Sequence, residues 1–275
     1  MAELTAGAVV MAAGCIETPR LWLNSDLPRN PWVGRGLTNH CFDWVGGIFD
    51  EKDLMSILGI PSAEPYAGHT SGARVDIPGT GIFQVSCLSP GLMSFLSYGF
   101  SEAGYDALLP PEPGAPWDIR GRVVGPALKE LMMNYSRTIT YLLLTDDETL
   151  YRNRVEVDPV LKDENGPIPL VYYTPSPKTL QRRDRLARYA CESLKAAGAR
   201  KVFRSDLPFA FQLHLESTMR MGYVVDSNCE AYEVRRLFIA DNSVHYNGIG
   251  GPNPTLTTQA LATRTADKLA CKYFS

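Results

Sequence analysis

The chain of 275 residues is long enough for one large domain or two small ones, and its composition, 45% hydrophobic and 21% charged, excludes an intrinsically disordered protein. A net charge of −3 provides no electrostatic footprint for nucleic acid, so we expect no nucleic-acid partner. The six cysteines have no paired spacing and the four histidines are scattered. This pattern favours buried thiols in a reducing, cytoplasmic compartment over a disulfide framework or a metal site.

The N-terminal segment has the pattern of a buried parallel sheet that leads into a helix. Residues 8–14 are small and apolar and predict a buried strand. Residues 1–14 lack the basic leader of a signal peptide, so we interpret them as folded chain. Thr18 and Pro19 predict the start of a helix that ends near Ser25. No stretch approaches the ~20 apolar residues of a membrane span, so we expect none.

Short strand-like runs dominate the middle of the chain, at 81–87, 137–144, 153–158 and 168–173. The last two runs alternate apolar and polar residues at period two, and residues 162–166 supply turn chemistry between them. This pattern predicts a half-exposed antiparallel hairpin. Residues 101–120 are rich in proline and glycine and predict a long loop that could cover a site.

A long helix is predicted after this hairpin. Ser176 and Pro177 mark its start, and Gly198 provides a C-terminal cap after about residue 197. Its polar face carries a basic stripe that includes Arg183. A stripe of this kind predicts a solvent-exposed surface.

The C-terminal segment combines a strand, a glycine loop and a helix start. Residues 236–240 predict a short strand buried on both faces. The glycines within 248–251 let the backbone approach a ligand closely. Asn253 is predicted as the N-cap and Pro254 as the first residue of a helix that keeps an apolar face to about Cys271. This order presents backbone N–H groups and the positive end of a helix dipole to an electron-rich ligand.

Several blocks, in order along the chain, resemble a known family. They are residues 9–25, 33–40, 213–222, 241–243 and 251–257. Together they resemble the glucose–methanol–choline (GMC) family of flavin oxidoreductases, and the block around His214 is most similar to the pyranose oxidase branch. The resemblance spans almost the whole chain and matches the C-terminal part of such an enzyme.

The resemblance implies a fold of the α/β class with an α+β substrate part. Residues 1–42 and 214–275 would form an incomplete Rossmann-like FAD domain. Residues 43–213 would form a substrate-binding domain with an antiparallel sheet, inserted between the two halves. The implied cofactor is FAD, and the implied substrate is a sugar or another alcohol whose CH–OH group is oxidised by hydride transfer to the flavin.

The resemblance also implies roles for individual residues. His214 stands where the family has its catalytic base, and a neutral histidine is suited to accept a hydroxyl proton. Asn253 stands where this branch has a partner amide that holds the same oxygen. The implied cofactor contacts are Ala13, Gly14, Asp241, Asn242, Asn253, Pro254 and Thr255.

Each of these roles has a structural alternative. From its spacing alone, His214 could be a hydrogen-bonded structural histidine, and Asn253 could serve only as an N-cap. Asp241 could be a turn former. We interpret His245 as a surface or structural histidine, with contact to the cofactor edge as the minor alternative. Glu216 departs from the family pattern and could crowd the substrate or raise the pKa of His214.

The glycine-rich GxGxxG turn that binds the FAD diphosphate has no counterpart in this sequence. One hypothesis is that the chain is the C-terminal part, or one subunit, of a GMC-type alcohol or sugar oxidoreductase that is incomplete on its own. A separate FAD-binding polypeptide could then supply the missing half. The other hypothesis is a catalytically silent fragment or accessory subunit that completes or binds such a polypeptide.

Overall fold

The computed structural model describes residues 4–63, 72–86, 89–98, 112–211 and 213–274. The chain divides into two compact units. The unit that we name the terminal unit consists of Met1–His40, Asp147–Ser176 and Gln212–Ser275. The unit that we name the central unit consists of Cys41–Asp146 and Pro177–Phe211.

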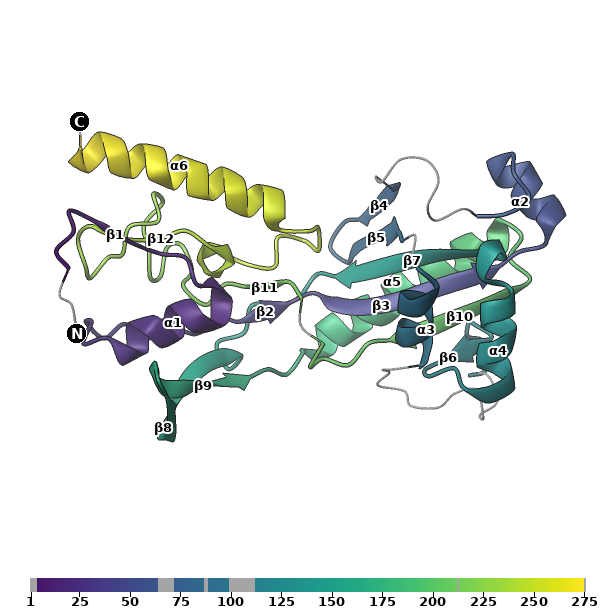
Figure 1. Ribbon diagram of the computed structural model, residues 1–275, viewed down its shortest axis with the longest axis horizontal. Coiled ribbons are helices and arrows are strands. Elements are labelled where there is room, and N and C mark those ends of the chain that lie inside the picture. The colour runs from purple at the N-terminus through teal and green to yellow at the C-terminus, as the bar shows by residue number, and fades with distance from the viewer. Residues whose placement is uncertain (1–3, 64–71, 87–88, 99–111, 212, 275) are drawn as a thin grey trace. The chain divides into compact units, whose positions relative to one another are not determined.

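The central unit is built on one sheet. Its strands are β3 (Cys41–Ile48), β4 (Arg74–Ile77), β5 (Gly81–Val85), β6 (Ile119–Arg120), β7 (Thr138–Thr145) and β10 (Lys201–Asp206). Their order is β4-β5-β7-β3-β10-β6, and all neighbours are antiparallel except β10 and β6 (Figure 1). The strands predicted at 81–87 and 137–144 are confirmed as β5 and β7, although residue 87 lies outside the described residues. Residues 101–111 of the predicted loop also lie outside them.

Helices cover both faces of this sheet. They are α2 (Glu51–Leu58), α3 (Pro90–Tyr98), α4 (Gly125–Met133) and α5 (Pro177–Ala196), with a 3-10 turn η2 (Tyr135–Arg137). Because strand side chains alternate between faces, Val45 of β3 packs in one core with Leu186 of α5. Trp44 packs in the other core with Leu96 of α3 and Leu131 of α4. The helix predicted from Pro177 is thus confirmed as α5.

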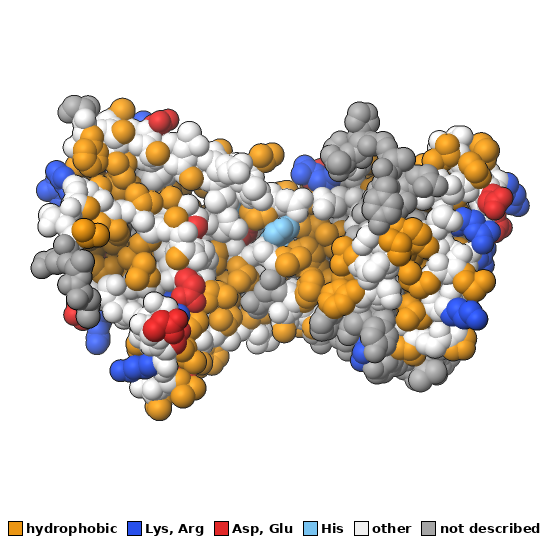
Figure 2. Space-filling view, viewed as in Figure 1, with side chains coloured by type: hydrophobic (Ala, Val, Ile, Leu, Met, Phe, Trp, Pro, Cys, Tyr) orange, Lys and Arg blue, Asp and Glu red, His pale blue; other side chains and the backbone are white. Residues whose placement is uncertain are grey.

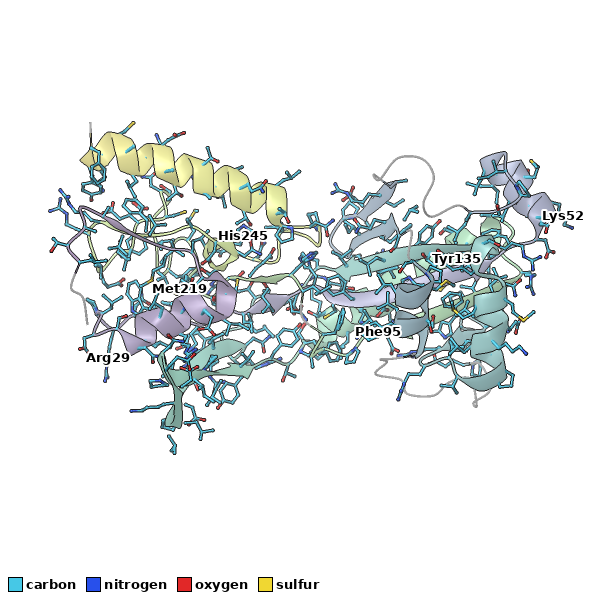
Figure 3. The ribbon with its side chains drawn as sticks, viewed as in Figure 1. Arg29, Lys52, Phe95, Tyr135, Met219 and His245 are labelled. Carbon is cyan, nitrogen blue, oxygen red and sulfur yellow. The ribbon has the colours of Figure 1, made fainter. Side chains whose placement is uncertain are left out.

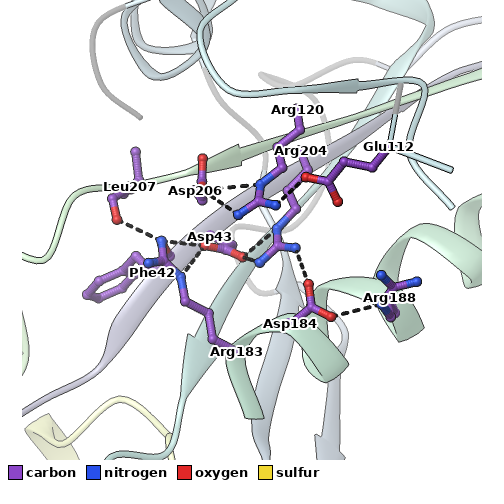
Figure 4. A network of polar contacts seen from close by, with 10 residues as sticks. All are labelled: Phe42, Asp43, Glu112, Arg120, Arg183, Asp184, Arg188, Arg204, Asp206 and Leu207. Carbon is purple, nitrogen blue, oxygen red and sulfur yellow. Dashed lines mark hydrogen bonds and ion pairs between the residues drawn. The ribbon is translucent and has the colours of Figure 1, made fainter. Parts of the chain in front are cut away.

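A buried ion-pair network joins α5 to the sheet (Figure 4). Asp43 of β3, only 1% exposed, accepts hydrogen bonds from Nε of Arg183 at 2.6 Å and Nε of Arg204 at 2.9 Å. Arg183 also donates to the carbonyls of Phe42 and Leu207, at 2.8 and 2.7 Å. The predicted exposure of the basic stripe is therefore wrong for Arg183. Its partner carboxylate lies 140 residues away along the chain, so local spacing could not indicate that the charge is compensated.

The terminal unit contains a short parallel strand pair, β1 (Val9–Met11) and β12 (Leu237–Ile239). Its helices are α1 (Gly14–Asn24) and α6 (Thr255–Tyr273), with a 3-10 turn η3 (Asn242–Val244). The side chains of β12 are all buried, which confirms the strand predicted at 236–240. Val9 and Val10 of β1 are 51% and 50% exposed, so the predicted burial is wrong for them. Within the described residues β1 has β12 as its only strand partner, so no strand pairs with its outer edge.

Helix α1 begins earlier than predicted. It starts at Gly14, whose positive φ of +85° turns the chain directly out of the strand, and Pro19 lies inside the helix. One hydrophobic core includes Trp22 of α1, Met219 and Val244, and Leu261 of α6 packs against it. Met219 and the buried His245 lie between α1 and α6 (Figure 3).

Two further strand pairs complete the terminal unit. They are β2 (Thr38–Asn39) with β11 (Leu215–Glu216), and β8 (Arg154–Asp163) with β9 (Gly166–Tyr172), both antiparallel. The second pair confirms the predicted hairpin. Arg20 of α1 donates to Asp163 at 2.5 Å and to the carbonyl of Pro167 at 2.9 Å, which fastens the hairpin to α1.

These contacts explain a difference from the expected domain boundaries. We expected the hairpin within the insert 43–213, whereas residues 147–176 belong to the terminal unit. The sequence pattern of a hairpin defines its two strands but not the element on which it packs. Of the helices described, none combines the length and apolar content that a membrane crossing requires.

Candidate active site

The pairing of β2 with β11 places two histidines opposite each other in the terminal unit. Leu215 pairs with Asn39, and the next cross-strand pair brings the His40 N–H to 3.4 Å from the His214 carbonyl. Directly opposite residues of an antiparallel pair have side chains on the same face. The two rings accordingly lie edge to face, with 3.1 Å between their Nδ1 atoms. His214 was predicted as a site residue, but its pairing with His40, 174 residues away, was not.

The glycine loop reaches this histidine pair. Nε2 of His40 lies 2.7 Å from the carbonyl oxygen of Gly248, and the Gly251 N–H donates to the same oxygen at 3.1 Å. Asn253 follows two residues later and is exposed. Because consecutive Cα atoms are about 3.8 Å apart, its Cα lies within roughly 8 Å of that of Gly251. The predicted partner amide therefore lies on the loop segment that contacts the histidine pair.

Burial keeps both histidines of the pair uncharged near neutral pH. It lowers the pKa of His40 to about 4, and it also lowers the pKa of the half-buried His214. Of the two effects considered for Glu216, crowding of the substrate or a raised pKa of His214, the second is not found, because burial lowers this pKa. The Glu216 carboxylate instead lies 3.4 Å from Nδ1 of His245, and both of these side chains are buried. His245 is consequently structural and not a surface residue.

Asp241 holds together the two turns that flank the strand pair. One carboxylate oxygen accepts the Gly14 N–H at 2.9 Å and the Thr18 hydroxyl at 2.5 Å. The other accepts the N–H of Ser243 at 2.8 Å and its hydroxyl. Both oxygens are thus engaged within the protein, as a turn former requires. A contact of Asp241 with a cofactor would have to be made through its backbone or a water molecule.

A cavity of about 480 Å³ lies beside these turns. It is lined by four of the predicted cofactor contacts, Ala13, Gly14, Asp241 and Asn242, together with Ala12, Cys15, Leu213, Leu215, Ala240 and Thr258. The two leucines flank His214 in the sequence, and His214 itself is not among the residues that line the cavity. Thr258 of α6 donates to Oδ1 of Asn242, which connects the helix start to the cavity wall.

The cavity residues fit contact with part of an extended cofactor such as FAD. Ala13 is small and exposed, and no atom lies within 4 Å of the place where a Cβ on Gly14 would be. The N–H groups of Ala13 and Gly14 already donate to Thr18 and Asp241. A group in the cavity would therefore meet these residues by close van der Waals approach and not through their N–H donors.

The start of α6 differs slightly from the prediction. The helix begins at Thr255, and Pro254 and not Asn253 occupies the N-cap position. No side chain caps the helix, and Thr255 is exposed, whereas Pro254 is buried. An uncapped helix N-terminus has unsatisfied N–H groups and a partial positive charge. The described residues hold no group of three or more His, Cys, Asp or Glu side chains arranged for a metal ion.

Comparisons with known proteins find similarity to oxidoreductases. Residues 150–262 match the model of the GMC oxidoreductase C-terminal domain. A 6'''-hydroxyparomomycin C oxidase of Streptomyces lividus is 29% identical over 98% of this chain and 45% of its own length. A long-chain-alcohol oxidase of Arabidopsis thaliana is 26% identical over 97% of this chain and 36% of its own length. The chain thus spans less than half the length of these relatives.

A solved structure shows the same fold. The crystal structure of pyridoxine 4-oxidase from Mesorbium loti aligns with 99% of this chain and 52% of its own, with a TM-score of 0.50 and 17% identity. The mixed α/β fold is therefore similar to that of a known oxidase. The comparisons thus show a similarity: residues 150–262 are similar to the C-terminal part of GMC oxidoreductases, and almost the whole chain is similar in sequence to a part of known oxidases.

Proposed function

We propose that this chain is the flavin- and substrate-facing part of an FAD-dependent oxidoreductase that oxidises a CH–OH group of a sugar or another alcohol. The observations that carry the proposal are the neutral His214, paired with His40, and a cavity of the same unit that four of the predicted cofactor contacts line. The names of the relatives, which include a C-glycoside 3-oxidase and a long-chain-alcohol oxidase, favour both substrate classes. A closer relation to pyranose oxidases is the finer form of the sugar proposal.

In the proposed reaction the substrate carbon loses a hydride and its hydroxyl loses a proton, which leaves a carbonyl group. Bound FAD would supply the hydride acceptor. His214 accepts the proton, because burial lowers its pKa and so keeps the imidazole neutral, with a nitrogen lone pair that can take the proton. The Asn253 amide hydrogen-bonds the substrate oxygen and does not compete for its proton. The N-terminus of α6, at Pro254 and Thr255, favours negative charge in front of it.

The proposal includes an FAD-binding segment that covers the terminal unit, either in the same polypeptide or in a separate one. The outer edge of β1 has no strand partner among the described residues, and Val9 and Val10 beside it are half exposed. Leu256 of α6 is 79% exposed. Hydrophobic side chains are visible on the surface of this unit (Figure 2). An edge strand with exposed apolar neighbours favours pairing with a further strand.

The same edge is the observation that favours the second candidate function, an accessory subunit that binds an FAD-containing polypeptide without catalysing the reaction. The two candidates share the surface but differ in His214. An accessory subunit would need His214 only as a structural residue, whereas the oxidoreductase needs it for each turnover.

The test joins or mixes this chain with a GxGxxG-containing FAD-binding polypeptide and follows the visible flavin absorbance after anaerobic addition of a sugar or an alcohol. We expect bleaching with the unchanged chain. His214→Ala should slow bleaching by a factor of about 10² or more while the flavin stays bound. Tyr232→Ala, at an exposed position of the same unit, is the control. Equal bleaching rates in all three proteins would favour the accessory subunit and contradict the catalytic proposal.

A further inference from the structure

Three groups in the terminal unit form a hydrogen-bonded chain with a defined direction. The carbonyl oxygen of Gly248 lies 2.7 Å from Nε2 of His40, and Nδ1 of His40 lies 3.1 Å from Nδ1 of His214. A carbonyl oxygen can only accept a hydrogen bond, so Nε2 of His40 must carry a hydrogen. If His40 is neutral, this hydrogen determines the donor and the acceptor in the contact between His40 and His214.

His40 is neutral under ordinary conditions, because it is fully buried and its pKa is lowered to about 4. A neutral imidazole has one N–H and one acceptor nitrogen. Since Nε2 of His40 is the donor, Nδ1 is the acceptor. Nδ1 of His214 must then be protonated to donate to it, and Nε2 of neutral His214 is left as the acceptor nitrogen of that ring.

We propose that His40 is a positioning residue that fixes the tautomer of His214, so that Nε2 of His214 accepts the proton of the substrate hydroxyl. The inference rests on the proposed function for the role of His214 and adds a residue that acts through it. In the proton step the substrate O–H bond breaks and an N–H bond forms at Nε2. The Nδ1–H bond toward His40 stays in place throughout, so His214 keeps its orientation while it becomes charged.

Two other polar side chains of the terminal unit, Glu216 and His245, contact each other. The Glu216 carboxylate lies beside His245, and Nε2 of His245 lies 3.3 Å from the Thr258 hydroxyl. The glycine loop gains a role from this arrangement, because the Gly248 carbonyl sets the tautomer of His40 and, through it, that of His214.

The tautomers are measured directly by two-bond proton–nitrogen correlation NMR of the imidazole rings in the full chain near neutral pH, with assignments from single histidine replacements. We expect a protonated Nδ1 and an unprotonated Nε2 for His214, and the reverse for His40. This measurement requires neither flavin nor substrate. A His214 ring that is protonated at Nε2 in the unchanged chain would overturn the inference without any variant.

Two replacements of His40 separate positioning from a structural role. In His40→Asn, Oδ1 takes the place of Nδ1 and can still accept from His214. In His40→Gln, the terminal amide nitrogen takes the place of Nε2 and can still donate to Gly248, but no acceptor remains at the δ position. We expect Asn to preserve the His214 tautomer and Gln to give a mixture of both tautomers. If His40 served only to hold the glycine loop through Gly248, His40→Gln would behave like the unchanged chain and His40→Asn would not.

The same variants are then tested in the flavin-loaded protein. We expect the rate of flavin reduction to fall about tenfold or more in His40→Gln and to stay within about threefold in His40→Asn. The same tautomer in both variants, or equal rates, would overturn the positioning role. If the tautomers are as expected but His214→Ala still reduces flavin normally, the proposed function fails while the hydrogen-bonded chain stands.

Discussion

Replacing Asp43 tests how α5 is held on the sheet of the central unit. Asp43 is the one carboxylate that Arg183 and Arg204 share in the buried network of Figure 4. Asp43→Ala would leave two buried guanidinium groups without their shared carboxylate. Removing one partner of a buried ion pair costs about 3–5 kcal/mol, because the remaining charge stays away from water.

The remaining contacts of the two arginines place the expected loss at the lower end of this range. Arg204 keeps Asp184 at 2.8 Å, and Arg183 keeps two backbone carbonyls. We therefore expect the free energy of unfolding to fall by about 3 kcal/mol in Asp43→Ala. The matched control is Asp76→Ala, which breaks an ion pair whose side chains are 48% and 56% exposed. Exposed pairs contribute less than about 1 kcal/mol.

The assay is equilibrium unfolding in urea, monitored by near-ultraviolet circular dichroism. The slope of the free energy of unfolding against urea concentration is compared between the proteins as a check. The expected result is a lower midpoint for Asp43→Ala at an unchanged slope. A loss no larger than that of the Asp76 control would refute the reasoning, because the buried carboxylate would then be dispensable for docking α5.

Three further predictions concern the terminal unit and the turns. The pKa of His40 falls from 6.5 to about 4 on folding, so its contribution of about 3 kcal/mol is complete above pH 6.5 and is lost as the pH falls toward 4. Urea unfolding measured across this pH range should show that loss, and the free energy of unfolding of His40→Asn should depend less on pH. The same pH dependence in both proteins would contradict the assignment of the loss to His40. Gly34→Ala should destabilise the fold strongly, because the added Cβ would lie 2.2 Å from the Val155 carbonyl oxygen at a φ of +76°. Gly79→Ala meets open space and should lower the free energy of unfolding, measured by thermal unfolding, by only about 1–2 kcal/mol. Val10→Lys should weaken binding of an FAD-containing polypeptide about tenfold or more in a pull-down titration, and unchanged binding would place the partner elsewhere.

Local patterns predicted the elements whose signals are local. The hairpin β8–β9 followed from alternation around a turn, and α5 followed from Pro177 at its start and Gly198 after its end. The strand β12 followed from a short apolar run. In each case the deciding information lies within about twenty residues, so a single sequence suffices.

The failures all depend on contacts between distant segments. Arg183 was expected in solvent because nothing near it in the sequence reveals Asp43. For His245 the sequence left a surface and a structural role open, and only its burial beside Glu216 decides for the structural one. The pairing of His40 with His214 depends on the register of two strands that are each two residues long. Strands this short have no detectable period, so their pairing cannot be inferred from the sequence.

The candidate site shows the same division. The family resemblance predicted His214, Asn253 and four of the residues that line the cavity, because it compares whole blocks of sequence. It did not identify the engaged oxygens of Asp241 or the shift of the N-cap from Asn253 to Pro254, because these depend on the geometry of individual turns.

The central claim is that a neutral His214 takes the hydroxyl proton of the substrate. Its most direct test is the rate constant of flavin reduction by an alcohol or a sugar, measured by anaerobic stopped flow as a function of pH. Because burial lowers the pKa of His214, the rate should rise with an apparent pKa below 6.5 and stay constant through neutral pH, and His214→Ala should abolish this dependence. An apparent pKa above 6.5, or the same profile in the variant, would contradict the account.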